Sequence, residues 1–249
     1  MKVKKGQLVF LVSRTKRYLV PAEGKFSCKY GAIEMKKLVG KRFGTKVKIG
    51  KEGFVVIEPS FLDMLFKKAV RGPQVILPKD AAVIAAETGC GKGWKVVDAG
   101  SGSGFLVLML GNVGCDVVSY EKNKDFLKVA KKNVKIMGVK NVKIKERDVT
   151  KGIPDRNVSL VTLDLEKPEK VIKHAFRALK PGGWLAIFSL HTEQVTAVRK
   201  ELKKYEMTSV KTVESLHREW QFQAGKRTWT RPKTHMLGHT GFLTFARKL

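Results

Sequence analysis

The segment VVDAGSGSGF, residues 96–105, decides the fold of this chain. Its apolar first residues predict a strand, and SGFLVLMLGNV, which begins within the loop, predicts a helix. Three glycines, Gly100, Gly102 and Gly104, fill the turn between the two elements. A glycine-rich turn between a strand and a helix lets backbone amides approach a ligand closely. The segment therefore predicts a nucleotide-type binding loop in an α/β fold.

The spacing of these glycines separates two classes of cofactor. A nicotinamide-dinucleotide loop reads G-x-G-x-x-G/A, which requires a small residue where this chain has Phe105. The chain instead reads D-x-G-x-G-x-G from Asp98, the pattern typical of S-adenosylmethionine-dependent methyltransferases. In that class the glycines let the backbone approach the methionine part of the cofactor. We therefore expect S-adenosylmethionine in this loop.

Carboxylates end the predicted strands that follow. Glu121 comes about 20 residues after the loop begins, where an acidic side chain can accept hydrogen bonds from both ribose hydroxyls. Asp148 ends the next strand, in position for the adenine amino group, and Asp164 ends the apolar strand after that. Because the carboxyl ends of parallel strands form one crevice, we expect these groups to meet there. We interpret Asp164 as the group that positions or deprotonates the methyl acceptor, and Glu166 as an exposed loop acid.

The pattern along the chain predicts the sheet. From Lys95 onward strands alternate with helices, which indicates a Rossmann-like, doubly wound and mostly parallel sheet. The helix PEKVIKHAFRALK is expected to stop at PGG, before the strand WLAIFSL. After Tyr205 two strand-like segments separated by a basic loop predict an antiparallel pair that closes the sheet edge.

Two domains are predicted. Residues 1–59 read as short strands, including a hairpin around the turn SRTK, and predict a small β domain. Residues 60–249 are expected to form the methyltransferase domain, with leading helices over 60–94. The first of these helices has Ser60 as its expected N-cap.

Charge is the informative bulk property. Fifty Lys and Arg face 22 Asp and Glu, a net charge of +28 that is spread along the whole chain. This excess favours a polyanionic partner, nucleic acid before a membrane surface, because no basic amphipathic helix with aromatic anchors is present. The three cysteines and five histidines lack metal-type spacing, so we expect no metal site and a cytoplasmic protein.

Four segments resemble a known family: RGPQVILPKDAA, VVDAGSGSG, LDLEKPEKVIKHAFRALKPGG and RPKTHMLGHTGFLTFARKL. They are similar to the tRNA adenosine-N1 methyltransferases that act on the T-loop, of the archaeal and bacterial TrmI type, and to the catalytic subunit of the eukaryotic enzyme. The resemblance runs almost end to end. It implies methyl transfer from S-adenosylmethionine to N1 of T-loop adenosine, at tRNA position 58 with 57 as a second candidate, and a homotetramer in the cytoplasm.

The resemblance also implies residue roles at the matching positions. Asp164 is expected to be the catalytic carboxylate and to contact the cofactor. The other cofactor-binding positions are Gln74, Gly100, Ser101, Gly102, Ser103, Gly104, Glu121 and Asp148. The substrate side is assigned to Leu77, Arg231, Pro232, His239, Thr240 and Gly241.

Two residues depart from the family pattern. Leu77 stands where the family tends to place an aromatic residue or a histidine, so base stacking is not expected there. Glu166 replaces the proline of the usual D-L-P sequence. We expect this change to make the loop more flexible and to add a charge that can raise the pKa of Asp164 or of Glu166 itself.

Three alternatives remain at this stage. One is a methyltransferase for another substrate, such as isoaspartyl protein or precorrin, although neither substrate requires a charge of +28. Another is a non-catalytic tRNA-binding subunit, although such subunits lose the glycine loop that this chain keeps. The third is a nicotinamide oxidoreductase, which Phe105 disfavours.

Overall fold

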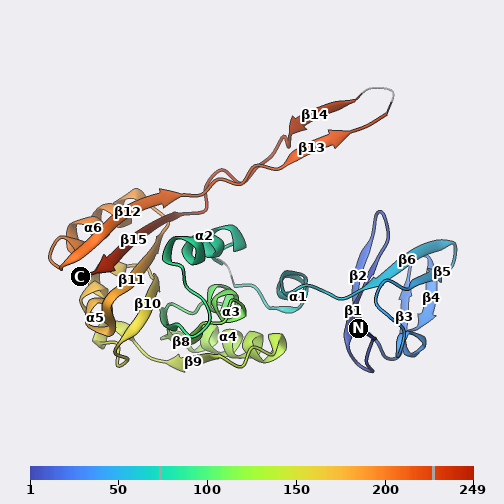
Figure 1. The fold of residues 1–249 in the computed structure, drawn as a ribbon, viewed down its shortest axis with the longest axis horizontal. Helices are drawn as coiled ribbons and strands as arrows, with labels where there is room; N and C mark the ends of the chain where they lie inside the picture. Colours follow the sequence, from blue (N-terminus) through green and yellow to red (C-terminus); the bar gives the residue numbers. More distant parts are fainter. Residues whose placement is uncertain (73–74, 226–227) are drawn as a thin grey trace. The chain divides into compact units, whose positions relative to one another are not determined.

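The computed structural model describes residues 1–72, 75–225 and 228–249 of the chain. These form two compact units, Met1–Ala69 and Val70–Leu249, and each is described by itself (Figure 1). The sequence-based boundary after residue 59 falls between the last strand of the first unit and its helix. Among the described residues no helix is both long and apolar enough to cross a membrane.

The first unit is a small antiparallel β structure. A four-stranded sheet has the order β2-β1-β6-β5, and β3 pairs with β4. The predicted hairpin is present, with β1 and β2 joined through the turn that starts at Ser13, whose backbone N–H donates to the carbonyl of Lys16. Ser60 and Asp63 form a reciprocal capping box at the start of the helix. The elements are β1 (Leu8–Val12), β2 (Arg17–Pro21), β3 (Lys25–Cys28), β4 (Gly31–Glu34), η1 (Met35–Leu38), β5 (Lys46–Ile49), β6 (Glu52–Ile57) and α1 (Phe61–Lys68).

The second unit contains a seven-stranded sheet of order β12-β15-β11-β10-β7-β8-β9. Strands β11, β10, β7, β8 and β9 are parallel, and β15 and β12 add an antiparallel edge. The predicted Rossmann-like fold is therefore confirmed. The strands are β7 (Lys95–Ala99), β8 (Asp116–Glu121), β9 (Val142–Glu146), β10 (Val158–Asp164), β11 (Leu179–Ser189), β12 (Met207–Glu214) and β15 (Phe242–Lys248).

Helices cover both faces of this sheet. Alternate strand residues point to opposite faces, so Val96 packs in one buried cluster with α2, α3 and α4, and Val97 in another with α5 and α6. The chain leaves β7 toward β8 and β9 and then returns to β10 on the other side of β7. This reversal places a crevice at the carboxyl ends of β7 and β10. The helices are α2 (Pro78–Thr88), α3 (Phe105–Asn112), α4 (Lys124–Met137), η2 (Val149–Lys151), η3 (Pro168–Lys170), α5 (Ile172–Ala178) and α6 (Thr192–Leu202).

The expected boundary at PGG is wrong. The helix ends at Ala178, and β11 already begins at Leu179 and runs through Gly182 and Gly183. The register between β10 and β11 shifts at this point, and a Cβ on Gly183 would lie 3.1 Å from the carbonyl oxygen of Val158. The two glycines therefore form an irregular start of the strand rather than a stop between two elements.

The C-terminal pair of strands is present with an addition. β12 and β15 pair antiparallel at the sheet edge, as predicted. Between them lies a segment that we name the arm, residues 215–240, in which β13 (Trp220–Gln223) pairs with β14 (Trp229–Pro232). Figure 1 shows these two strands side by side beyond the ends of β12 and β15. The sequence pattern did not predict this second hairpin.

Candidate active site

The glycine loop lies against the end of β10. Gly100 follows β7 with φ at +95°, and a Cβ there would lie 2.0 Å from the backbone oxygen of Asp164. Its N–H donates to the carbonyl of Tyr120 at 2.9 Å. Gly104 caps α3 with φ at +83°. Position 100 therefore requires glycine for two reasons: its φ is positive, and Asp164 leaves no room for a Cβ.

A buried network lies beneath the loop. The carboxylate of Asp98 accepts from the hydroxyl of Ser119 at 2.5 Å and from that of Thr162 at 2.6 Å. Because Ser119 gives its proton to Asp98, it accepts from Ser101, whose hydroxyl lies 2.5 Å away. Burial raises the pKa of Asp98 to about 6. Asp98 thus joins β7 to β8 and β10 directly and to the loop through Ser119. It is buried and holds these elements together.

Glu121, the last residue of β8, has its carboxylate fixed by the backbone. One oxygen accepts from the N–H of Gly102 at 3.0 Å and the other from the N–H of Asn123 at 2.8 Å. The side chain is buried, yet it lines the cavity described below. Each carboxylate oxygen keeps a further lone pair, so the group can still accept hydrogen bonds from a ligand.

Asp148 lies two residues after β9 rather than at its last residue. It caps η2, where its Oδ1 accepts from the backbone N–H of Thr150 at 3.0 Å and from the hydroxyl of the same residue at 2.7 Å. These bonds lower the pKa of Asp148, so it is ionised at neutral pH. Its position next to the cavity is the one that the sequence predicts.

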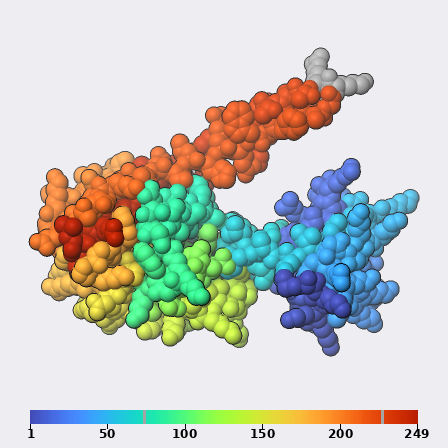
Figure 2. Space-filling view, viewed as in Figure 1, coloured from blue at the N-terminus to red at the C-terminus, as the bar shows by residue number. Residues whose placement is uncertain are grey.

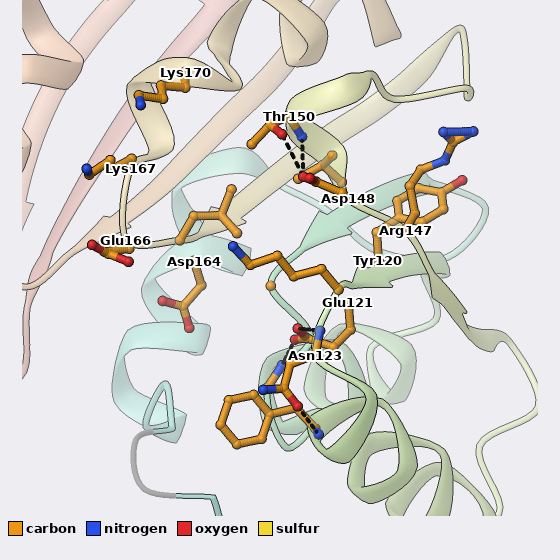
Figure 3. Close-up of a pocket in the computed structure, with 16 residues that line it drawn as sticks. Tyr120, Glu121, Asn123, Arg147, Asp148, Thr150, Asp164, Glu166, Lys167 and Lys170 are labelled. Atoms are coloured by element: carbon orange, nitrogen blue, oxygen red, sulfur yellow. Dashed lines mark hydrogen bonds between the residues drawn. The ribbon is translucent and has the colours of Figure 1, made fainter.

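A cavity of about 460 Å³ opens at the carboxyl ends of these strands (Figure 3). Figure 3 shows Glu121, Asp148 and Asp164 around it, with basic side chains at its border. The residues that line it are Gly100, Gly102, Tyr120, Glu121, Lys122, Asn123, Phe126, Arg147, Asp148, Val149, Thr150, Asp164, Leu165, Glu166, Lys167 and Lys170. Several of these, Phe126 and Arg147 among them, were not singled out in the sequence. Arg147 directly follows β9 and Phe126 lies in the first turn of the helix after β8, and these places near strand ends are the signal that could have found them.

Asp164 is the carboxylate with the most unusual environment. It is the last residue of β10 and is half-buried, and among the described residues no donor forms a hydrogen bond with its carboxylate. Burial, followed by the negative charges of Asp98 and Glu121, raises its pKa to about 7. A carboxyl group that titrates near neutral pH at a cavity wall is suited to contact a reacting group.

Glu166 does not have the expected effect on this carboxylate. The charges that raise the pKa of Asp164 are those of Asp98 and Glu121, whereas the side chain of Glu166 is exposed. The loop is also held, because the carbonyl of Glu166 accepts from Nε2 of Gln194 at 2.8 Å. The proline of the family pattern is thus replaced by a tethered residue.

Several of the other predicted residues lie outside the cavity. Ser101, Ser103 and Gly104 belong to the glycine loop but do not line the cavity. The buried hydroxyl of Ser103 has no hydrogen-bond partner among the described residues. Leu77 precedes α2, and Gln74 lies outside the described residues.

The C-terminal positions gather on and around the arm. Arg231 lies on β14 with its guanidinium 4.9 Å from the ring centre of Trp229. His239 lies at the base of the arm, where Nδ1 is 2.5 Å from Glu214 and Nε2 is 3.0 Å from the carbonyl oxygen of Leu190. Gly241 directly precedes β15, and a Cβ on it would lie 2.4 Å from the ring of Phe188. These positions are therefore built into the arm and its base, apart from the cavity.

Comparison with known proteins gives a consistent picture. A family model described as a methyltransferase domain matches residues 90–234. The tRNA (adenine(57)-N(1)/adenine(58)-N(1))-methyltransferase TrmI of Methanocaldococcus jannaschii is 33% identical to this chain. The match covers 94% of this chain and 92% of the relative. A tRNA (adenine(58)-N(1))-methyltransferase TrmI of Thermus thermophilus is 31% identical over 69% of this chain and 68% of its own.

Solved structures agree over the full length. The tRNA (m1A58) methyltransferase TrmI of Aquifex aeolicus superimposes with a TM-score of 0.84 at 26% identity, covering 100% of this chain and 99% of its own. A Thermotoga maritima structure described as a SAM-dependent O-methyltransferase superimposes with a TM-score of 0.86 at 29% identity. The match covers 100% of this chain and 95% of the Thermotoga chain. By contrast, a Pyrococcus abyssi protein-L-isoaspartate O-methyltransferase matches 52% of this chain at 32% identity.

Proposed function

The chain belongs to the TrmI family of tRNA (adenine-N1)-methyltransferases, and from this premise we propose that it methylates N1 of an adenosine in the T-loop of tRNA. S-adenosylmethionine is the methyl donor. The observation that supports the proposal most directly is the cavity at the reversal point of the sheet, bordered by Gly100, Glu121 and Asp164.

The residues at the cavity fit S-adenosylmethionine. Gly100 and Gly102 line the cavity, and nothing lies within 4 Å of the Cβ position of Gly102, so a ligand can approach the backbone of the loop closely there. We propose that Glu121, whose orientation two backbone amides fix, accepts from the ribose hydroxyls, and that the ionised Asp148 accepts from the adenine amino group. When bound, the cofactor supplies an electrophilic methyl group on a positively charged sulfur. Three carboxylates around one cavity also suit that positive charge.

Asp164 is proposed to act on the acceptor base. Methylation at N1 leaves a positive charge on adenine, and an ionised carboxylate at the exocyclic amine stabilises that charge. N1 itself has a free lone pair, so the protein has to align the base rather than remove a proton from it. The target nucleotide must leave its pairing for this edge to be reached. The location of Asp164 at the end of β10, beside the glycine loop, supports this role.

The charge of +28 supports tRNA as the substrate, since each phosphate contact releases counterions. The Methanocaldococcus relative is named for adenines 57 and 58, and the Thermus relative for adenine 58 alone. We propose adenosine 58 as the principal target. A cytoplasmic location is proposed together with this substrate.

The test uses unmodified tRNA transcripts and S-adenosylmethionine labelled in the methyl group, followed by mapping of the modified base. Label on N1 of T-loop adenosine supports the proposal, and a transcript with that adenosine replaced by guanosine is the control. The Thermotoga structure is described as an O-methyltransferase, so an isoaspartyl peptide is included as a second acceptor. Transfer to the peptide and none to tRNA would contradict the proposal.

We also propose that the protein assembles with copies of itself, as a homotetramer. The arm exposes large apolar side chains, with Trp220 at 63% and Phe222 at 69% exposed, and apolar surface of this kind is typical of protein interfaces. Light scattering after gel filtration measures the assembly. A monomer at micromolar concentration would contradict the proposal, and Trp220→Ser with Phe222→Ser is expected to reduce the assembled fraction.

A further inference from the structure

Lys79, the second residue of α2, is a nearly buried cation with all three donors engaged. Its side chain is 13% exposed. The ammonium donates to Oδ1 of Asp80 at 2.6 Å, to the carbonyl of Ser215 at 2.6 Å and to the hydroxyl of Thr240 at 2.7 Å. Ser215 and Thr240 are the two ends of the arm. One side chain therefore joins the start of α2 to both chain segments at the base of the arm, and Figure 2 shows the surfaces of α2 and of this base adjoining.

The base of the arm is also joined to the loop that follows Asp164. His239 faces Glu214 with Nδ1 and the carbonyl of Leu190 with Nε2; both partners are acceptors, so both ring nitrogens carry protons. The N–H of Leu190 donates to Oε1 of Gln194 at 2.7 Å, and Nε2 of Gln194 donates to the carbonyl of Glu166. A continuous chain of hydrogen bonds thus runs from the arm to the catalytic loop.

The described residues 70–72 and 75–80, which lead into the first turn of α2, are named here the strap. Its first end lies against the glycine loop. The amide of Asn133, which is fully buried, accepts from the N–H of Val70 and donates to the carbonyls of Val70 and Ser103, each at 2.8 Å. A Cβ on Gly72 would lie 3.6 Å from that of Ser103. The strap is therefore fixed by Asn133 at one end and by Lys79 at the other.

We propose that Lys79 is a positioning residue for the methyl acceptor, an inference that rests on the proposed function. Lys79 joins the strap to the base of the arm, and that base is joined to the loop after Asp164. The hydrogen bonds that begin at Lys79 thus lead through the base of the arm to Glu166, two residues after Asp164. The groups proposed to hold the cofactor, Glu121 and Asp148, lie on β8 and after β9 and make none of these contacts. Loss of Lys79 should therefore impair use of tRNA and leave cofactor binding intact.

The choice of variant follows from Asp80. This carboxylate is 1% exposed and its Oδ2 has no hydrogen-bond partner among the described residues, so removing Lys79 alone leaves a buried charge without its ion-pair partner. Such a change is strongly destabilising by itself. The double variant Lys79→Met with Asp80→Asn removes both charges and keeps the side-chain sizes. Lys79→Arg keeps the charge, and Lys204→Met removes a lysine that is 65% exposed on another part of the same unit.

Affinity for S-adenosylmethionine is measured by calorimetry, and kcat and KM are measured with tRNA at saturating cofactor. For the double variant we expect the cofactor Kd within about twofold of the wild type and kcat/KM for tRNA reduced by about tenfold or more. Lys79→Arg is expected to recover most of that loss, and Lys204→Met to change either quantity by less than about twofold. A double variant with unchanged kcat/KM, or one that loses cofactor affinity in the same proportion, overturns the inference.

A failure of the proposed function is separable from a failure of the inference. If the wild type methylates no tRNA, the proposed function is wrong, and hydrogen exchange still tests the contact itself. The backbone amides near 213–216 and 239–242 should exchange faster in the double variant than in Lys204→Met. Equal exchange in the two variants would show that Lys79 does not hold the base of the arm.

Discussion

The backbone oxygen of Asp164 lies 2.0 Å from the point at which any residue other than glycine would place its Cβ at position 100. The first glycine of the loop and the proposed catalytic carboxylate are thus adjacent through backbone packing, although they lie 64 positions apart in the sequence and no local pattern links them. Their proximity means that a shift of the loop at Gly100 displaces Asp164, the residue that we propose acts on the acceptor.

Gly100→Ala is expected to abolish cofactor binding. The residue has φ at +95° and no room for a Cβ, so the loop must shift, with strain on the order of 1–3 kcal/mol before the contact with Asp164 is counted. Gly138→Ala is the matched control, because its φ of +64° is also positive, nothing lies within 4 Å of its Cβ position, and it does not line the cavity. Calorimetry with S-adenosylmethionine and thermal unfolding compare the two. Equal behaviour would contradict the packing argument.

Asp164→Asn is expected to lose nearly all turnover and to keep cofactor binding, because the amide cannot stabilise positive charge on the base.

The Asp164→Asn variant should also be more stable than the wild type in alkaline solution. The pKa of about 7 in the folded state exceeds the unfolded value of about 3.9, so the ionised group disfavours folding. The gain, on the order of 2 kcal/mol, should be full above pH 7 and absent below about pH 4. Denaturant unfolding at several pH values measures it. Near-normal turnover would remove Asp164 from the mechanism.

The glycine loop and its carboxylates were predictable because their signals are local. A strand, a turn rich in glycine and a helix follow one another within residues 96–112, and Glu121 and Asp164 each end a strand whose apolar pattern is plain. The fold rule that brings the carboxyl ends of parallel strands together then supplies their meeting place. Asp148 was placed near the cavity by the same reasoning, although it lies in a capped turn after the strand.

Other features depend on partners distant in sequence. β11 begins at Leu179 because it pairs across an irregular register with β10, which the motif PGG does not reveal. The pKa of Asp164 is set by burial and by Asp98 and Glu121, whereas the sequence directed attention to its neighbour Glu166. The hairpin of the arm was not predicted because residues 207–223, which hold both β12 and β13, read as one strand-like segment, and because β14 is too short and exposed to show the alternation of a half-buried strand.

Glu121→Gln is expected to weaken S-adenosylmethionine binding by about tenfold or more, since the amide keeps one acceptor where two oxygens now accept from the N–H groups of Gly102 and Asn123. The loss combines the ribose contact with the fixed shape of the loop. Glu146→Gln is the control: this residue pairs with Glu121 in the register of β8 and β9 but is exposed. Calorimetry should separate the variants clearly, and an unaltered Kd for Glu121→Gln would contradict the ribose assignment.

The rate should rise with pH through the neutral range. Asp164 must be ionised to face the charge that develops on adenine, and with a pKa of about 7 only about a tenth of the free enzyme is ionised at pH 6. We therefore expect kcat/KM to increase by about fivefold from pH 6 to 7, and by about tenfold in all when it levels off near pH 8.

Below pH 6 the decline in kcat/KM should steepen, because Asp98, with a pKa of about 6, then also gains a proton and loses its role as acceptor for Ser119 and Thr162. At saturating cofactor the inflection in kcat should move to lower pH, since a positive sulfur nearby favours the ionised carboxylate. Initial rates at constant ionic strength measure both profiles; a kcat/KM that is flat between pH 6 and 8 would show that the ionisation of Asp164 does not limit the reaction.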